Sequence, residues 1–182
     1  MADTTKLESC AKVIVARRNR VLNREGYVSL LLRILLLALI GWVLFSQVFL
    51  ITQVSGNAMF PAVKDGDLII GFRMQQQYAK DDVIVYTCNG QTRVGRIVAR
   101  GTDVVTLDES GTLLVNGTPE GGQILYPTYA KEGLEYPMQV PEGSVFILGD
   151  YRTQAEDSRD YGPIPMEAVE GKVITILRRR GL

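Results

Sequence analysis

Ser55-Gly56-Asn57-Ala58-Met59-Phe60-Pro61 comes just after the longest apolar run in the chain and opens a region of short, strand-like segments. The segment separates two parts of different character. The part before it has the composition of a membrane helix, and the part after it has the turn spacing of a β domain.

Residues 34–51, ILLLALIGWVLFSQVFLI, contain no charged side chain. At about 1.5 Å per residue, a helix of this length crosses most of a hydrocarbon core about 30 Å thick, and apolar neighbours extend it. A cleaved secretory signal would have a shorter apolar core, and a buried helix of a soluble protein would show a polar stripe. We therefore predict one transmembrane helix over residues 30–53.

Basic residues gather on the N-terminal side of this run. They are Lys12, Arg17, Arg18, Arg20 and Arg24. Residues 52–63, on the other side, carry no charge. Because cytoplasmic flanks are rich in Lys and Arg, we expect residues 1–29 in the cytoplasm and residues 54–182 outside a cell membrane that the chain crosses once. A basic amphipathic helix over residues 11–22 is an alternative, but we interpret these charges as a topology signal.

Beyond residue 54, short strand-like segments alternate with turns. The expected strands are residues 68–72, 82–87, 92–99, 103–107, 112–115, 144–148 and 172–177. Residues 121–140 show no period and are expected to form a long loop or an inserted subdomain. Helical periodicity is nearly absent, which predicts a mainly β domain, a barrel or sandwich, and not a βαβ fold.

The composition excludes several classes of function. Lys and Arg together number 20, as do Asp and Glu, so no basic field favours nucleic acid. The chain has no His, which removes His-based triads and His metal sites. Cys10 and Cys88 lack metal-ligand spacing and should lie on opposite sides of the membrane. We expect neither a metal nor a cofactor.

A set of short motifs occurs in a fixed order after the apolar run. It comprises residues 55–61, Gly66-Asp67, residues 82–86, Arg96-Ile97-Val98-Ala99, Gly149-Asp150-Tyr151-Arg152, Asp157-Ser158-Arg159 and Gly162-Pro163-Ile164. From residue 33 to the end, the chain resembles the signal peptidase I family, of the S26 type and closest to Gram-positive members. The resemblance implies a membrane-anchored coiled β-sheet domain, and active members remove signal peptides from secreted proteins.

The resemblance also implies that the catalytic side chains are missing. Active members use a Ser nucleophile and a neutral Lys base, because a Ser hydroxyl alone is weakly nucleophilic. The nucleophile position is Ala58, the base position is Gly95, and the Ser that supports the Lys is replaced by Ala155. The Asn of the Gly-Asp-Asn-Arg motif is Tyr151. Three inert residues together indicate that the dyad is lost as a unit.

Other side chains are candidates to replace the missing nucleophile and base. Ser55 has no base beside it in sequence, Ser158 lies in a segment that looks structural, and Cys88 has only Arg93 as a nearby cation. The acids Asp150, Glu156, Asp157 and Asp160 suggest an acid pair or metal site, but Arg152 and Arg159 are interleaved with them. We interpret these charges as ion pairs that stiffen a loop. The residues expected to be structural are Gly149, Asp150, Arg152, Asp157, Ser158 and Arg159.

Loss of the dyad leaves the peptide groove of the family, because main-chain pairing needs no catalytic side chain. The residues expected in the groove are Ser55, Asn57, Ala58, Met59 and Phe60. We expect a protein without peptidase activity that binds secreted or surface polypeptides, similar to the non-catalytic family members that assist assembly of pili from pilin subunits. The alternatives are an active signal peptidase with a non-standard nucleophile and a structural partner that regulates an active paralogue.

Overall fold

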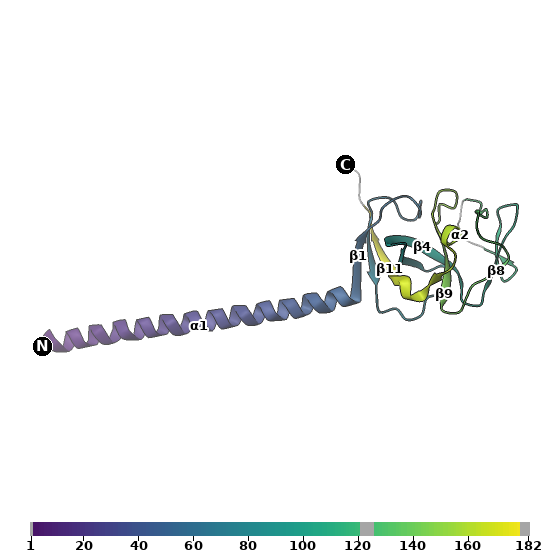
Figure 1. Ribbon diagram of the computed structural model, residues 1–182. Coiled ribbons are helices and arrows are strands. Elements are labelled where there is room, and N and C mark those ends of the chain that lie inside the picture. The colour runs from purple at the N-terminus through teal and green to yellow at the C-terminus, as the bar shows by residue number, and fades with distance from the viewer. Residues whose placement is uncertain (1, 121–125, 179–182) are drawn as a thin grey trace. The chain divides into compact units, whose positions relative to one another are not determined.

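The computed structural model describes residues 2–120 and 126–178, and it divides the chain into two compact units after Ser46. The first unit is helical and the second contains the strands (Figure 1). The side chains of residues 2–16 and 18–25, which include most of the basic flank, and residues 121–125 of the expected loop lie outside the described part.

The first unit is the helix α1, Ala2–Val48. Its part from Gly26 to Val48 is long and apolar enough to cross a membrane. These 23 residues span about 34 Å as a helix, and their large apolar side chains are exposed, Trp42 by 72%. The hydroxyl of Ser46 donates to the carbonyl oxygen of Val43 at 2.8 Å, which satisfies this polar group inside the apolar segment.

The helix ends earlier than the expected boundary at residue 53. Residues Phe49–Gln53 form strand β1, which pairs antiparallel with β2, Leu68–Phe72. Both conformations suit an apolar run, so composition alone does not mark the change from helix to strand. Pairing with β2 decides it, because the register from Phe49 opposite Phe72 to Gln53 opposite Leu68 satisfies the backbone of residues 49–53.

Two antiparallel sheets make up the second unit within the described residues. The larger sheet has the order β1-β2-β11-β3-β4-β9-β10, and the smaller has the order β7-β6-β5-β8. The remaining strands are β3 Val83–Cys88, β4 Gln91–Arg100, β5 Val104–Leu107, β6 Leu113–Val115, β7 Thr118–Pro119, β8 Met138–Gln139, β9 Ser144–Leu148, β10 Ile164–Pro165 and β11 Val169–Leu177. Two short helical turns, α2 Ser158–Tyr161 and η1 Met166–Ala168, follow β9.

The mainly β prediction is confirmed. Residues 68–72 and 144–148 form β2 and β9 with the predicted bounds, and the other predicted strands occur with shifted ends. Two Asn-Gly pairs, at residues 89–90 and 116–117, connect hairpins with positive φ at both residues, as such tight turns require. Of residues 121–140, expected as a long loop or an inserted subdomain, residues 126–137 contain no strand, but Met138–Gln139 form β8, which pairs with β5.

Three apolar clusters form the core. One lies between β4, β9 and the smaller sheet, and a second is built around Tyr86, Ile97 and Ile147. The third contains Met59 and Val63 and so anchors the segment after β1 to the larger sheet. This third cluster fixes the position of residues 55–61.

Candidate functional site

Two hydrogen bonds from backbone amides fix the N-terminal end of the segment 55–61. The amide of Val54 donates to the carbonyl oxygen of Asp67 at 2.8 Å, and the amide of Gly56 donates to Oδ1 of Asp65 at 2.7 Å. Gly56 has a φ of +86°, a conformation that a residue with a β-carbon adopts only with strain. These bonds hold the start of the segment without using the side chain of residue 58.

The apolar residues of this segment have separate roles. Met59 is 1% exposed and Val63 is fully buried, so both pack in the core. Phe60 is half-buried, and its ring centroid lies 6.0 Å from that of Tyr151, which in turn lies 4.6 Å from Tyr126. Tyr151, which replaces the family Asn, thus belongs to a short aromatic row beside residue 58.

Ala58 and Ala155 both lie against Gly149, the residue that follows β9. The amide of Tyr151 donates to the carbonyl oxygen of Ala58 at 2.9 Å. A β-carbon on Gly149 would lie 2.6 Å from that same oxygen and would overlap the β-carbon of Ala155. Residue 149 must therefore be Gly for these segments to approach each other.

The base position of the family, Gly95, is packed against the same end of β9. A β-carbon at this position would overlap Cγ2 of Ile147 and would lie 3.2 Å from Cε1 of Tyr86. Gly95 is buried in β4, opposite Ile84 of β3. The three positions that the resemblance predicts for the catalytic side chains, 58, 95 and 155, thus converge around residues 147–149.

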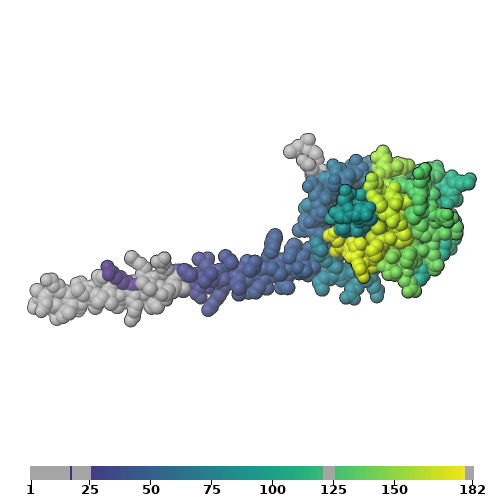
Figure 2. All heavy atoms as spheres, in the orientation of Figure 1, coloured from purple at the N-terminus to yellow at the C-terminus, as the bar shows by residue number. Residues whose placement is uncertain are grey.

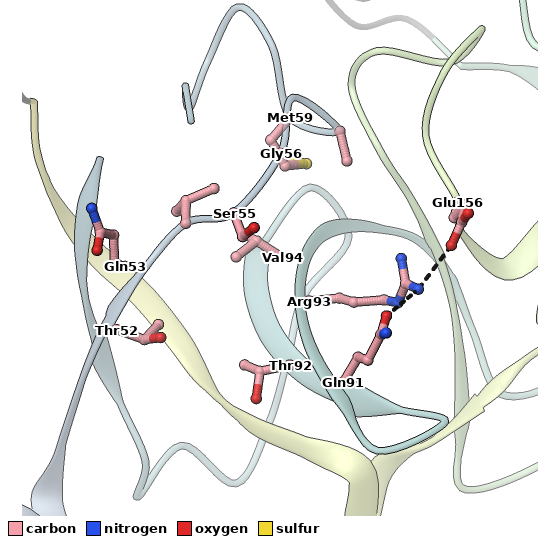
Figure 3. A pocket seen from close by; sticks show the side chains of 12 residues that line it. Thr52, Gln53, Ser55, Gly56, Met59, Gln91, Thr92, Arg93, Val94 and Glu156 are labelled. Atoms are coloured by element: carbon pink, nitrogen blue, oxygen red, sulfur yellow. Dashed lines mark hydrogen bonds and ion pairs between the residues drawn. The ribbon is translucent and has the colours of Figure 1, made fainter. Parts of the chain in front are cut away.

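A pocket of about 390 Å³ opens beside Ala58 (Figure 3). Its walls are β1, the segment after it, the first residues of β4 and the loop before α2. It is lined by Thr52, Gln53, Val54, Ser55, Gly56, Ala58, Met59, Gln91, Thr92, Arg93, Val94 and Glu156. In Figure 2 the surface of the first strands of the β domain (blue) lies next to the surface of the β3–β4 hairpin (teal). Of the expected groove residues, Ser55, Ala58 and Met59 line the pocket, whereas Asn57 and Phe60 are not among its lining residues.

Arg93 and Glu156 supply the charge of the pocket wall. Nη2 of Arg93 lies 2.8 Å from Oε2 of Glu156 and 2.8 Å from Oε1 of Gln91, as the dashed lines in Figure 3 show. The hydroxyl of Tyr161 donates to Oε2 of Glu156 at 2.7 Å, and the guanidinium of Arg93 lies 5.2 Å from the Tyr161 ring centroid. Hydrogen bonds from Tyr161 and then from Arg93 lower the pKa of Glu156. Burial, followed by the bond to Glu156, raises the pKa of Tyr161 to about 12.

The segment after β9 is held by buried ion pairs. Asp150 accepts from both Nε and Nη2 of Arg96, at 2.8 and 2.7 Å, and Asp157 accepts from the same two atoms of Arg159. Burial of Asp157 and Arg159 is nearly complete, since each side chain is 2% exposed. The expected pairing within this segment occurs for Arg159 and Asp157. The other charged residues pair outside it: Asp150 with Arg96, Glu156 with Arg93, Asp160 with Lys131 and Arg152 with Glu120.

Arg152 and Ser158, the two remaining polar residues of the motif, also form hydrogen bonds inside the domain. Arg152 is fully buried, and its Nη2 lies 3.2 Å from Oε2 of Glu120. Its Nη1 donates to the hydroxyl of Thr128 at 2.8 Å. The hydroxyl of Ser158, also fully buried, accepts from the amide of Ile147 at 2.9 Å. A hydroxyl in this position supports β9 and does not face the pocket residues.

No described side chain forms a nucleophile and base pair in the pocket. Among the described residues, no hydrogen bond joins the hydroxyl of Ser55 to a basic side chain. The Lys131 ammonium donates to the carbonyl oxygen of Ala155 at 2.7 Å and to Oδ2 of Asp160 at 2.6 Å, and it is not among the residues that line the pocket. In the described part of the chain, no group of three or more His, Cys, Asp or Glu is arranged to hold a metal ion.

Neither the Arg93–Glu156 pair nor the contact of Lys131 was predicted from the sequence. Arg93 and Glu156 are 63 residues apart, and no local pattern links them. The sequence offered one signal for the position of Arg93. Because side chains alternate between the two faces of a strand, Arg93 and Gly95 must lie on the same face of the sheet.

Comparison with known proteins shows the family of this chain. The sequence model of a family described as signal peptidase, peptidase S26, matches residues 27–177. Signal peptidase IB of Staphylococcus aureus is 30% identical over 148 residues, which are 69% of this chain and 76% of that protein. Signal peptidase I of Bacillus caldolyticus is 28% identical over 136 residues, 66% of this chain and 74% of that protein. The solved structure of a signal peptidase I from Enterococcus faecalis matches with a TM-score of 0.46 and 28% identity, covering 55% of this chain and 98% of that one.

Plant relatives are longer than this chain. Probable thylakoidal processing peptidase 2, chloroplastic, of Arabidopsis thaliana is 30% identical over 139 residues, which are 67% of this chain and 36% of that protein. The chain therefore spans only about a third of the length of this relative.

Proposed function

This chain belongs to the signal peptidase family, peptidase S26, and from that premise we propose that it binds secreted or surface polypeptides without cutting them. One observation carries the proposal. The nucleophile position is Ala58, yet the pocket beside it remains open and is bounded by unpaired strand edges. The site thus retains a means of holding an extended chain but lacks a group that attacks one.

The strand edges that bound the pocket follow from the sheet register. β1 pairs only with β2, so its other edge is unpaired within the described residues. β4 pairs with β3 from Gln91 to Arg96, but its pairing with β9 begins only at Arg96. Residues 91–95 therefore have an open edge that faces the pocket. An extended peptide adds to such an edge through main-chain hydrogen bonds.

The chemistry of the pocket supports binding over hydrolysis. A hydroxyl attacks a peptide carbonyl only when a base within hydrogen-bond reach removes its proton. Arg93, which lines the pocket, stays protonated at any working pH and cannot act as that base. Removing the members of a Ser–Lys unit leaves only what transition-state hydrogen bonds and binding supply.

In its finer form the proposal assigns a role in assembly. The chain is anchored in the cell membrane with residues 1–29 in the cytoplasm and residues 54–182 outside, and its clients are secreted or surface polypeptides such as pilin subunits. The apolar helix from Gly26 to Val48 supports the anchor, and the resemblance to non-catalytic family members supports the role as a pilus assembly chaperone. We also infer structural roles for Gly149, Asp150, Arg152, Asp157, Ser158 and Arg159, as their buried contacts suggest.

An active signal peptidase is the second candidate. It is favoured by the relatives, whose names describe peptidases, and by the hydroxyl of Ser55, which lines the same pocket as Ala58. In that case Ser55 would be the non-standard nucleophile, and a group not hydrogen-bonded to it in this conformation would have to approach it.

The test compares cleavage and binding in one preparation. Purified full-length protein in detergent is incubated with a preprotein that carries an Ala-x-Ala cleavage site, and with the matching mature protein. We expect binding without cleavage products in mass spectrometry. Cleavage at the Ala-x-Ala site that disappears in Ser55→Ala would overturn the proposal in favour of the second candidate. Absence of any binding to either polypeptide would overturn both the groove and the assembly role.

A further inference from the structure

Arg93 holds its carboxylate partner differently from two other arginines of the domain. Arg96 and Arg159 each donate from both Nε and Nη2 to one carboxylate, the side-on arrangement that fits the two oxygens. Arg93 uses only Nη2 for Glu156, and its Nε is buried with no hydrogen-bond partner among the described residues. A buried donor without an acceptor is costly, so this guanidinium has an unused binding position.

The two partners of this ion pair are fixed to different degrees. The Arg93 side chain is 22% exposed and is held over the Tyr161 ring, whereas the Glu156 side chain is 62% exposed. Gln91, the other acceptor of Nη2, is exposed as well. Glu156 and Gln91 can therefore rotate into water, while Arg93 remains on the pocket wall.

The strand edge decides what lies opposite Arg93. Within the described residues, the edge of residues 91–95 of β4 that faces away from β3 is unpaired. Arg93 lies directly opposite Tyr86 of β3, so the two side chains are on the same face of the sheet. In a strand added to this edge, side chains directly opposite Arg93 or diagonal to it point to the same face, within reach of a long side chain. Within the pocket lining, Arg93 is the one cation and Glu156 the one anion.

We propose that Arg93 is a specificity-determining residue of the groove, which selects an extended peptide with an acidic side chain at the position facing it. The inference rests on the peptide-binding function proposed above. The incoming carboxylate displaces Glu156 and accepts from both Nε and Nη2, which completes the side-on arrangement already seen at Arg96 and Arg159. Glu156 thus occupies the acidic subsite of the empty groove.

A basic peptide side chain fits this wall less well. Glu156 already accepts from Arg93 and Tyr161, and a cation would be placed next to the Arg93 guanidinium, which lies over the Tyr161 ring. The peptide cation and the Arg93 guanidinium would repel each other, and sharing Glu156 as an acceptor would offset little of this repulsion.

The test uses fluorescein-labelled ten-residue peptides with alternating Ala and Val. Glu, Gln or Lys is placed at each position in turn, and binding to the full-length protein in detergent micelles is followed by fluorescence anisotropy. At one position we expect the Glu peptide to bind about tenfold more tightly than its Gln counterpart, because charged hydrogen bonds exceed neutral ones. Equal affinity for the Glu, Gln and Lys peptides at every position would overturn this inference while leaving the proposed function intact. Failure of all peptides to bind would overturn the proposed function itself.

Two variants separate recognition from a structural role. Arg93→Lys keeps the charge but loses the side-on arrangement, and we expect it to lose most of the preference for Glu. Glu156→Gln removes the internal competitor, and we expect severalfold tighter binding of the Glu peptide with little change for the Gln peptide. Weaker binding of the Glu peptide to Glu156→Gln would mean that Glu156 supports the site and does not compete for it, which would overturn the inference.

Discussion

Ile147 packs so closely against the α-carbon of Gly95 that a β-carbon at residue 95 would overlap its Cγ2 atom. The overlap involves a branched, fully buried side chain, and the ring of Tyr86 closes the other side. Neither neighbour has a free end that rotates away. Residue 95, which the resemblance predicts as the position of the base, is therefore part of the packed core of the sheet.

Substitution of Gly95 by Ala tests this packing. We expect Gly95→Ala to lower the free energy of unfolding by about 1–3 kcal/mol, the usual cost of adding an atom to a filled core. The measurement is denaturant unfolding of the purified protein in detergent, followed by circular dichroism.

Gly71→Ala is the matched control, because this strand glycine also lies in the larger sheet but its β-carbon would make ordinary contacts of 3.4 Å or more. We expect a smaller loss of stability than for Gly95→Ala. The double variant Gly95→Ala with Ile147→Ala should lose less stability than the sum of the single changes, since truncation of Ile147 removes the overlap. Strictly additive losses would contradict the packing argument.

Ala58→Ser alone should not produce a peptidase. The new hydroxyl would lie in the pocket without a base, and an unactivated Ser is a poor nucleophile. Incubation of the variant with a preprotein, analysed by mass spectrometry, checks this expectation. Efficient cleavage by this single variant would reveal a base that the described residues do not present. Ala58→Ser with Gly95→Lys should also remain inactive and should unfold more easily than Gly95→Ala, because the Lys stem begins inside the space of Ile147.

Local chemistry explains which parts of the fold were predictable. The strand β2 and the Asn116-Gly117 turn were marked by short-range signals, namely an apolar run between turn residues and a pair that tolerates positive φ. The end of α1 was not marked, because residues 49–51 continue the apolar run of the helix before them without a break. Only pairing with β2, a contact made after the intervening loop, converts them to a strand.

The site was predictable in part, for a related reason. Ser55, Ala58 and Met59 of the expected groove line one pocket, because these residues are near one another in sequence, and the binding of a peptide there stays a prediction. The Arg93–Glu156 pair joins β4 to the loop before α2, and only the folded sheet brings these elements together. Pairs this distant in sequence leave no periodic signal to read.

Asp157 should be among the most sensitive residues of the domain. Its carboxylate is 2% exposed, pairs with Arg159, and accepts from the amide of Gly149 at 3.2 Å. Asp157→Asn leaves the buried guanidinium without a counter-charge, for which we expect a loss of about 3–5 kcal/mol in denaturant unfolding. Arg73→Gln is the control, because its contact with Glu170 is 3.9 Å long and its side chain is 40% exposed. That change should cost about 1 kcal/mol or less, and similar costs for the two variants would contradict the assigned role of burial.

Lowering the pH should weaken the Arg93–Glu156 ion pair and reduce its contribution to stability. Hydrogen bonds from Tyr161 and Arg93 lower the pKa of Glu156 in the folded state below its ordinary value of 4.5. Folding therefore favours the ionised carboxyl, and its contribution to stability is present above pH 4.5 and is lost as the pH falls through the lower folded-state pKa.

Thermal unfolding of the protein and of Glu156→Gln, followed across this pH range, measures that contribution. We expect the melting temperature of the variant to lie below that of the unchanged protein above pH 4.5 and the two to converge in more acidic solution. Glu132→Gln, at an exposed loop residue, is the control and should show no such convergence. A difference that grows as the pH falls would have the wrong sign for a lowered pKa.

The orientation of the chain is tested by single cysteines. Replacement of Cys10 and Cys88 by Ser gives a background in which Gln76→Cys, at an exposed loop residue, reports on the β domain, and Thr5→Cys reports on the N-terminal segment. Because the basic residues precede the apolar helix, we expect a membrane-impermeant maleimide added to intact bacterial cells to label Gln76→Cys only. Thr5→Cys should react only after the cells are opened. Labelling of Thr5→Cys in intact cells with protection of Gln76→Cys would reverse the orientation, and it would place the groove on the side of the membrane where secreted clients are not yet exposed.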